Sequence, residues 1–208
     1  MKNFKTPQEL FWAGNFGSEY ISRNESDQLL ASNLNFFATA LRQVGKIQSC
    51  HEFGANIGMN LRALRLLFPS ISLSAVEINP DASKILSNYI GEQNVYEGSI
   101  FDYSISHQFD LSMIKGVLIH INPDMLNVVY QKLYESSRKY ILICEYYNPS
   151  PISINYRGHS DKLFKRDFAG ELMDKYSDLI LVDYGFVYKR DPVFPQDDIT
   201  WFLMERKE

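Results

Sequence analysis

Cysteine is scarce in this chain of 208 residues. The two that occur, Cys50 and Cys144, each lie in an apolar, strand-like run, so we expect buried free thiols. The sequence contains no CxxC pair and no cluster of cysteine and histidine residues, which are the usual ligands of a structural metal ion. We therefore expect no bound metal.

Long apolar runs and excess positive charge are also missing. No apolar stretch reaches the roughly 18–20 residues that a membrane-spanning helix needs. Residues 1–5 do not begin a signal peptide, because polar residues follow them. We expect a cytoplasmic protein that does not bind a membrane. The formal net charge is -4, from 21 basic and 25 acidic residues, which argues against nucleic acid as the main partner.

What the chain does have is an ordinary globular composition with many tyrosines. The hydrophobic fraction is 45% and the charged fraction 22%, and the length fits one domain with a sizeable core. The 13 tyrosines exceed what such a core needs. Tyrosine offers an apolar face and a hydroxyl group, so the excess suits a polar, sugar-like pocket.

Residues 1–46 predict a helical cap. The motif Thr-Pro-Gln-Glu at 6–9 is typical of a helix start, with proline at the first helical position. Two glycines among aromatic residues then break this helix. Apolar residues at helical spacing predict a second helix over about 27–44. The segment between them, 18–24, is either a packed connector or a lid over a cofactor or substrate.

From residue 47 onward, strand and helix patterns alternate. This alternation predicts a doubly wound α/β fold with a mostly parallel sheet, and ligands bind such sheets at the carboxyl ends of the strands. Two strand-like runs, 179–188 and 199–205, follow without a helix between them, so we expect them to pair as an antiparallel hairpin. We predict a single domain with a core over 47–208, and a polar, aromatic excursion at about 146–165 that shapes a substrate pocket.

The stretch from Glu52 to Gly58 is the strongest indication of a ligand. It ends an apolar strand, continues as a glycine-containing turn and leads into a helix, which is the arrangement that binds nucleotide-like cofactors. The full G-x-G-x-x-G pattern is incomplete, because Asn56 stands where the middle glycine would be. Glu77 ends the second strand, where a carboxylate can accept hydrogen bonds from two ribose hydroxyls.

Three stretches carry a resemblance to a known family: FWAGNFGSEYISRN (11–24), HEFGANIGMNLRAL (51–64) and ICEYYNPSP (143–151). The chain resembles the class I S-adenosylmethionine-dependent methyltransferases, whose seven-stranded sheet ends in a hairpin of the predicted kind. Within that class, it is similar to the methylases associated with pseudaminic acid biosynthesis. The resemblance implies S-adenosylmethionine as the cofactor and a role in sugar-acid glycan biosynthesis, without establishing the acceptor.

We predict a cofactor site on the turn, the strand ends and the cap. The resemblance implies that Glu52 lies near the methionine end of the cofactor. Ser99 stands where methyltransferases often carry an acid that meets the adenine amino group. The predicted cofactor residues are Trp12, Tyr20, Arg23, Glu52, Gly54, Asn56, Gly58, Glu77, Ile78, Ser99, Ile100, Lys115 and Gly116.

His120 is the predicted general base, because imidazole titrates near neutrality and the end of the fourth strand faces the methyl group in this class. The alternative is a capping or packing histidine. The predicted acceptor pocket uses tyrosine and histidine for hydroxyl groups and arginine for carboxylate or phosphate; a solvated charged loop is the alternative. Its residues are Glu145, Tyr146, Tyr147, Tyr156, Arg157 and His159.

We therefore predict methyl transfer to a small polar acceptor. The expected acceptor is a sugar, a sugar nucleotide or a nonulosonic, pseudaminic-type acid intermediate of surface glycan biosynthesis. Two alternatives stay open: an NAD-dependent oxidoreductase on a similar fold, and a non-catalytic cofactor-binding subunit. The Asn-Pro-Ser-Pro stretch at 148–151 lacks the tyrosine of the amino-methylase motif of nucleic-acid enzymes and follows the wrong strand. We expect a monomer or a homodimer.

Overall fold

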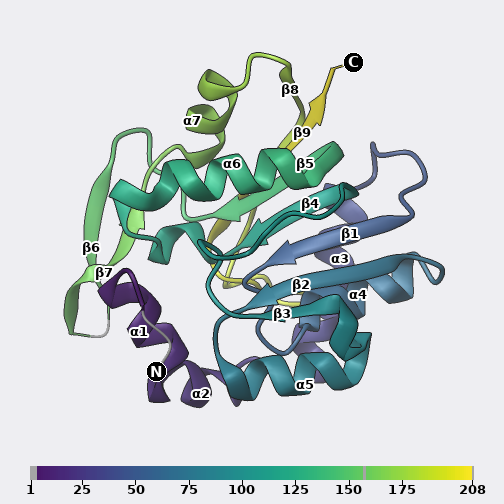
Figure 1. The fold of residues 1–208 in the computed structure, drawn as a ribbon. Coiled ribbons are helices and arrows are strands. Elements are labelled where there is room, and N and C mark those ends of the chain that lie inside the picture. The colour runs from purple at the N-terminus through teal and green to yellow at the C-terminus, as the bar shows by residue number, and fades with distance from the viewer. Residues whose placement is uncertain (1–3, 157, 208) are drawn as a thin grey trace.

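The computed structural model describes residues 4–156 and 158–207 and confirms the predicted α/β fold (Figure 1). Its main sheet has seven strands in the order β3-β2-β1-β4-β5-β9-β8. The strands that pair in parallel are β1(Ser49–Phe53), β2(Ser72–Glu77), β3(Val95–Glu97), β4(Phe109–Lys115) and β5(Ser137–Glu145). The last two, β8(Leu179–Val187) and β9(Ile199–Arg206), form the predicted antiparallel hairpin, and β9 pairs with β5.

Helices cover both faces of this sheet, because side chains alternate between the two faces of each strand and most strands are apolar on both. One face packs against α3(Asp27–Ala40), α4(Met59–Leu67) and α5(Pro80–Ile90). The other packs against α6(Leu126–Ser136) and α7(Phe168–Lys175). Phe36 and Phe37 of α3 are completely buried in the first layer, so this helix is part of the core packing.

Two short helices, α1(Pro7–Ala13) and α2(Asn15–Ile21), lie at the carboxyl ends of the parallel strands (Figure 1). The first helix begins as predicted: the Thr6 side chain accepts a hydrogen bond from the Glu9 backbone N–H, and the Glu9 carboxylate accepts one from the Thr6 backbone N–H. Gly17 permits the tight α1–α2 corner, since a Cβ there would lie 1.9 Å from the Trp12 carbonyl oxygen. Because α3 packs in the core, we use the name cap from here on for residues 5–24 alone, rather than for the whole of 1–46.

The excursion between β5 and α7 forms a separate two-stranded hairpin, β6(Ile152–Tyr156) and β7(His159–Lys165). It stands beside α1 in Figure 1. The sequence predicted the position of this excursion but not its strands, because its polar residues obscure the alternation on which a strand prediction rests. Three short 3-10 helices, η1(Glu92–Asn94), η2(Leu118–His120) and η3(Pro123–Met125), complete the described elements.

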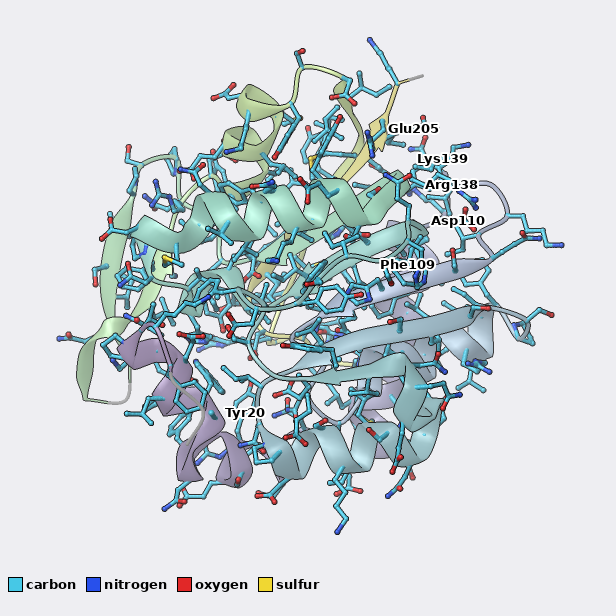
Figure 2. All side chains as sticks on the ribbon, viewed as in Figure 1. Tyr20, Phe109, Asp110, Arg138, Lys139 and Glu205 are labelled. Atoms are coloured by element: carbon cyan, nitrogen blue, oxygen red, sulfur yellow. The ribbon has the colours of Figure 1, made fainter. Side chains whose placement is uncertain are left out.

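Charged side chains gather at the end of the sheet opposite the cap (Figure 2). Asp110 pairs with Arg138 there, and Glu205 pairs with Lys139 at 3.4 Å. In the same view, Tyr20 marks the cap end. The part of the chain that the structure describes contains no helix long and apolar enough to cross a membrane.

Candidate active site

A cavity of about 220 Å³ lies where the strands β1, β2 and β4 end beneath the cap. We call it the first chamber. Its core wall comes from the turn after β1, the end of β2, the loop after β3 and the end of β4, while the cap contributes the opposite wall. Parallel α/β sheets bind ligands at this edge, so the chamber lies where the sequence placed the cofactor.

The turn after β1 adopts left-handed backbone angles at Gly54 (φ 76°), Asn56 (φ 49°) and Gly58 (φ 82°). Asparagine tolerates this region better than most residues, which explains how it replaces a glycine. At Gly54 a Cβ atom would lie 2.6 Å from a methyl group of Val117, so a larger residue there would have to displace this side chain. The turn aims the backbone N–H of Asn56 at Glu77.

Glu77 holds the turn and the end of β2 together. Its two carboxylate oxygens accept hydrogen bonds from the backbone N–H groups of Asn56 and Asn79, each at 2.7 Å. The side chain is buried at 6% exposure and lines the first chamber. Burial raises the pKa of Glu77, and the backbone hydrogen bonds oppose that shift. A carboxylate has about four lone-pair sites, so Glu77 can still accept a hydrogen bond from a ribose hydroxyl.

Glu52 does not line the first chamber, but it contacts Asn60, which does. Its Oε1 accepts a 2.6 Å hydrogen bond from Asn60, which lines the chamber. Its Oε2 is buried without a hydrogen-bond partner among the described residues. Burial raises the pKa of Glu52 to about 8, while the Asn60 hydrogen bond and the charge of Lys115 lower it. A cationic ligand beside Asn60 would favour the ionised form of Glu52.

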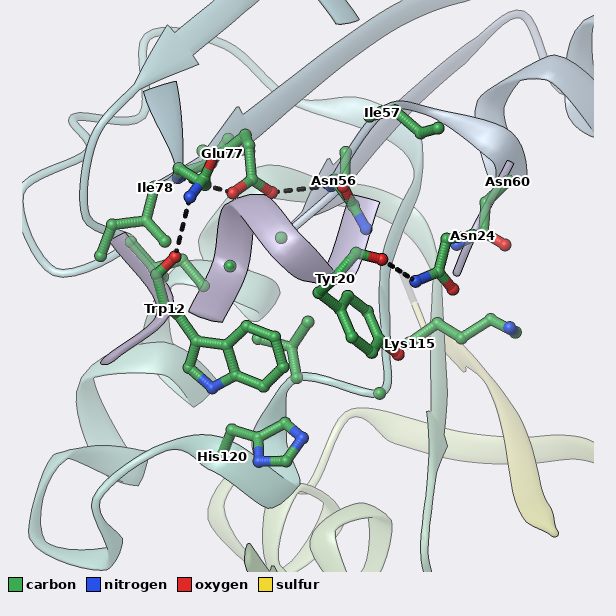
Figure 3. A pocket seen from close by; sticks show the side chains of 18 of the residues that line it. Trp12, Tyr20, Asn24, Asn56, Ile57, Asn60, Glu77, Ile78, Lys115 and His120 are labelled. Atoms are coloured by element: carbon green, nitrogen blue, oxygen red, sulfur yellow. Dashed lines mark hydrogen bonds between the residues drawn. The ribbon is translucent and has the colours of Figure 1, made fainter. Parts of the chain in front are cut away.

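Asn79 fastens the cap to the core wall. Its Oδ1 accepts hydrogen bonds from the first backbone N–H groups of α5, while its Nδ2 donates to the carbonyls of Trp12 (3.2 Å) and Gly14 (3.3 Å). A second contact joins Ser18 to Asp81 at 2.6 Å. These bonds hold Trp12 between Glu77 and His120, as Figure 3 shows.

His120 lies at the end of the first chamber. Its Nδ1 lies 2.6 Å from the backbone oxygen of Lys162 in β7. A carbonyl oxygen only accepts, so Nδ1 carries the proton and Nε2 holds a lone pair. The imidazole packs between Trp12 and Tyr156, with ring-centroid distances of 4.7 and 5.1 Å. Burial lowers the pKa of His120 to about 4, and the hydrogen bond to Lys162 opposes the shift. The ring is therefore neutral at pH 7.

A second chamber of about 290 Å³ adjoins the first. The two share lining residues, among them Tyr20, Gly116 and His120, so His120 lies at the boundary. The second chamber also has a mixed polar lining of Arg23, Asn24, Ile119, Tyr146, Tyr156, Asp197 and Ile199. This arrangement can place two different ligands on either side of one neutral imidazole.

Most of the residues predicted to bind the cofactor come together in the first chamber. Glu52 and Gly58 are the exceptions on the core side, since Glu52 acts through Asn60 and Gly58 begins α4 behind the turn. Arg23 lines the second chamber rather than the first. The predicted residues that line the first chamber are Trp12, Tyr20, Gly54, Asn56, Glu77, Ile78, Ser99, Ile100, Lys115, Gly116 and His120.

Only some of the residues predicted for the acceptor pocket line the second chamber. Tyr146 and Tyr156 line the second chamber. Glu145 does not: it is buried, and its Oε1 accepts hydrogen bonds from the backbone N–H groups of Val117 and Leu118, at 2.9 and 2.8 Å. Tyr147 is 42% exposed, with its ring near Phe202. Arg157 and the side chain of His159 lie outside the described residues.

Several lining residues escaped the sequence analysis. Asn33 of α3 and Gln196 of the β8–β9 loop line the first chamber and hydrogen-bond to each other at 2.8 Å, although 163 positions separate them. Asp197 enters the second chamber from the same loop. No spacing rule links these positions, because only the return of β9 beside β5 brings them together. Asn60 could have been found as a polar residue in the first turn of α4.

Neither a family model nor a curated protein matches the chain. Several solved structures have a similar fold. The 1,6-didemethyltoxoflavin-N1-methyltransferase of Burkholderia thailandensis, with S-adenosylhomocysteine bound, is 17% identical, with a TM-score of 0.72 over 100% of this chain and 93% of that one. The plantazolicin methyltransferase is 12% identical, with a TM-score of 0.64 over 97% and 94%. An S-adenosylmethionine-dependent methyltransferase of Clostridium acetobutylicum is 11% identical, with a TM-score of 0.64 over 93% and 98%. The chain thus has the class I methyltransferase fold.

Proposed function

We propose that the protein transfers a methyl group from S-adenosylmethionine to a small polar acceptor. The observation that carries this proposal is the pair of adjoining chambers that share Gly116 and His120. One chamber has the features of a nucleoside site, and the other offers polar side chains to a second molecule. A reaction between two bound molecules needs such an arrangement, because most of the catalytic gain comes from alignment and exclusion of water.

The residues of the first chamber fit the cofactor. Glu77 keeps acceptor capacity beyond its backbone hydrogen bonds, which suits a ribose hydroxyl. The side-chain oxygen of Asn56, on the turn, is buried without a partner among the described residues and lines the same chamber. Asn60, backed by Glu52, suits a cationic amino group. S-adenosylmethionine supplies an electrophilic methyl group on a sulfonium centre when it is bound.

His120 acts, in this proposal, as the base that receives a proton from an acceptor hydroxyl. Its Nε2 holds the lone pair because Lys162 fixes the proton on Nδ1. Trp12 and Tyr156 hold the ring in place and limit the access of water. An acceptor that presents an unprotonated amine or a carboxylate needs no such base, so the effect of removing His120 also reports which atom is methylated.

The second chamber suits a sugar derivative. Tyr20, Tyr146 and Tyr156 provide flat apolar faces with hydroxyl groups, and Arg23 can bind a carboxylate or a phosphate. Burial raises the pKa of Tyr146, so its hydroxyl stays a hydrogen-bond donor at neutral pH. We propose a sugar, sugar nucleotide or pseudaminic-type acid as the acceptor class, supported by this chemistry and by the stretches at 11–24 and 143–151. The neighbours in fold include a methyltransferase for didemethyltoxoflavin and one for a glycopeptide.

The test is incorporation of label from methyl-labelled S-adenosylmethionine into a panel of hexoses, nucleotide sugars and nonulosonic acids, read by mass spectrometry. We expect transfer to at least one sugar derivative and a loss of transfer in His120→Ala. Binding of S-adenosylmethionine without transfer to any acceptor, including a cell extract, would support a non-catalytic subunit. Binding of NAD alone would support an oxidoreductase.

A further inference from the structure

We propose that Glu9, on the first helix of the cap, accepts a hydrogen bond from the exocyclic amino group of the cofactor's adenine. The cap would then take part in cofactor recognition and select adenine over a 6-oxo purine. This inference rests on the proposed function, because it concerns the same first chamber.

Glu9 is a buried carboxylate with one oxygen already used. The side chain is 6% exposed and lines the first chamber. Its Oε2 accepts hydrogen bonds from the backbone N–H groups of Lys5 (2.6 Å) and Thr6 (2.8 Å). Its Oε1 is buried and has no hydrogen-bond partner among the described residues. A buried acceptor without a donor is unfavourable, so a ligand N–H group beside it would be bound selectively.

The position of Glu9 in the chamber indicates which part of a ligand it meets. Lys5, which precedes α1 and donates its backbone N–H to Glu9, forms an ion pair with Asp102 at 2.5 Å, so the start of the cap contacts the loop that follows β3. That loop and the end of β2 contribute Ile78, Ile100 and Phe101 to the chamber lining. These apolar side chains suit the faces of a purine, whereas Asn60 and Lys115 suit the charged end of an amino acid.

In the loop after β3, the oxygens of Ser99 already accept hydrogen bonds from the backbone. The hydroxyl oxygen of Ser99 accepts a hydrogen bond from the Phe101 backbone at 3.0 Å, and its carbonyl oxygen accepts from Asp102 and Tyr103 at 3.1 and 3.2 Å. Glu9 lines the chamber, and its Oε1 is buried with no hydrogen-bond partner among the described residues. Adenine presents an amino group, whereas hypoxanthine would turn a carbonyl oxygen toward the carboxylate and be repelled.

The test uses the variant Glu9→Gln, because the reciprocal cap of α1 accepts glutamine as well as glutamate. The amide oxygen can accept from Thr6, which turns the amide N–H₂ group toward the chamber in place of an acceptor. Wild type and variant are titrated calorimetrically with S-adenosylhomocysteine and with its 6-oxo analogue, S-inosylhomocysteine. We expect wild type to prefer the adenine compound by at least about tenfold, and the variant to lose about tenfold of that preference or reverse it.

Lys5→Ala is the matched control, since it loosens the same helix turn but keeps the Glu9 carboxylate. Lys5→Ala should lower the affinities for S-adenosylhomocysteine and S-inosylhomocysteine by the same factor, so that the preference for the adenine compound is unchanged. An unchanged preference in Glu9→Gln overturns the inference while the proposed function stands, provided that wild type binds S-adenosylhomocysteine. If wild type binds neither compound, both proposals are wrong. If the variant fails to fold, equal affinity of wild type for the two compounds is itself enough to overturn the inference.

Discussion

The two walls of the first chamber are held together in different ways. On the core wall, Glu77 is joined by two 2.7 Å hydrogen bonds to the backbone of Asn56, 21 positions away, and to the backbone of Asn79, two positions away. On the cap wall, contacts join residues more than sixty positions apart, such as Asn79 with Trp12 and Ser18 with Asp81. The core wall forms with the sheet, whereas the cap wall depends on a few polar bonds and on aromatic packing. We therefore expect the core wall to determine whether the cofactor binds. We expect the cap wall to adjust the affinity for the cofactor and the rate of turnover.

The largest effect should come from breaking the core wall at Glu77. Glu77→Ala removes the acceptor for the ribose and leaves two backbone N–H groups unpaired, so we expect a loss of at least about 3 kcal/mol in the binding of S-adenosylhomocysteine, roughly a hundredfold. Calorimetry measures this, with Glu92→Gln on the exposed η1 as the control. Affinity within twofold of wild type would show that Glu77 does not contact the cofactor.

Removing the imidazole of His120, which lines both chambers, should lower kcat without weakening cofactor binding. For a hydroxyl acceptor, we expect His120→Ala to lower kcat by about a hundredfold, the usual contribution of a general base, while the Kd for S-adenosylhomocysteine changes little. His107→Ala, in an exposed loop, serves as the control. If kcat is unchanged at every pH, His120 is a packing residue or the acceptor needs no base.

Detaching the cap should have a smaller effect. Asn79→Asp keeps the cap of α5, because aspartate is an equally good N-cap residue, but it loses the donors to the Trp12 and Gly14 carbonyls. We expect affinity for S-adenosylhomocysteine to fall by about tenfold, the equivalent of one or two hydrogen bonds, and amide hydrogens of α1 and α2 to exchange faster. Unchanged exchange in these helices would contradict the role given to Asn79.

The smallest expected change is in the pH dependence of wild type. Burial lowers the pKa of His120 to about 4, so the base is already neutral and active above that pH. With cofactor and acceptor saturating, so that a change in binding through Glu52 does not enter, kcat should therefore vary by less than about twofold from roughly pH 5.5 to 8 and decline only as the pH falls toward 4. An inflection near pH 6.5, the ordinary value for histidine, would show that His120 is not buried as described.

The contrast between the walls also explains what the sequence could predict. Strand, turn, helix and second strand follow one another in the stretch 49–77, so local pattern was enough to single out Gly54 and Asn56 in the turn and Glu77 at the end of the second strand. The hairpin of β8 and β9 followed from the missing helix between two strand-like runs. These features depend on neighbours in the chain, which is why periodicity reveals them.

The residues that the sequence did not reveal depend on contacts between distant segments. Gln196 reaches Asn33, and Lys162 fixes the tautomer of His120, only because β9 and β7 return to the strand ends. Glu145 was predicted as part of the polar, aromatic stretch expected to form the acceptor pocket, yet it turns inward to accept two backbone N–H groups of the β4–η2 turn. Side-chain direction at a strand end is set by such local demands for hydrogen bonds, which sequence patterns do not encode.

The measurement that tests the account most directly is a parallel calorimetric titration of the wild-type protein with S-adenosylhomocysteine and with NAD. The structure of the core wall predicts that S-adenosylhomocysteine binds at one site per chain and that NAD does not bind. Binding of NAD with no binding of S-adenosylhomocysteine would contradict the assignment of the first chamber and, with it, the proposed function.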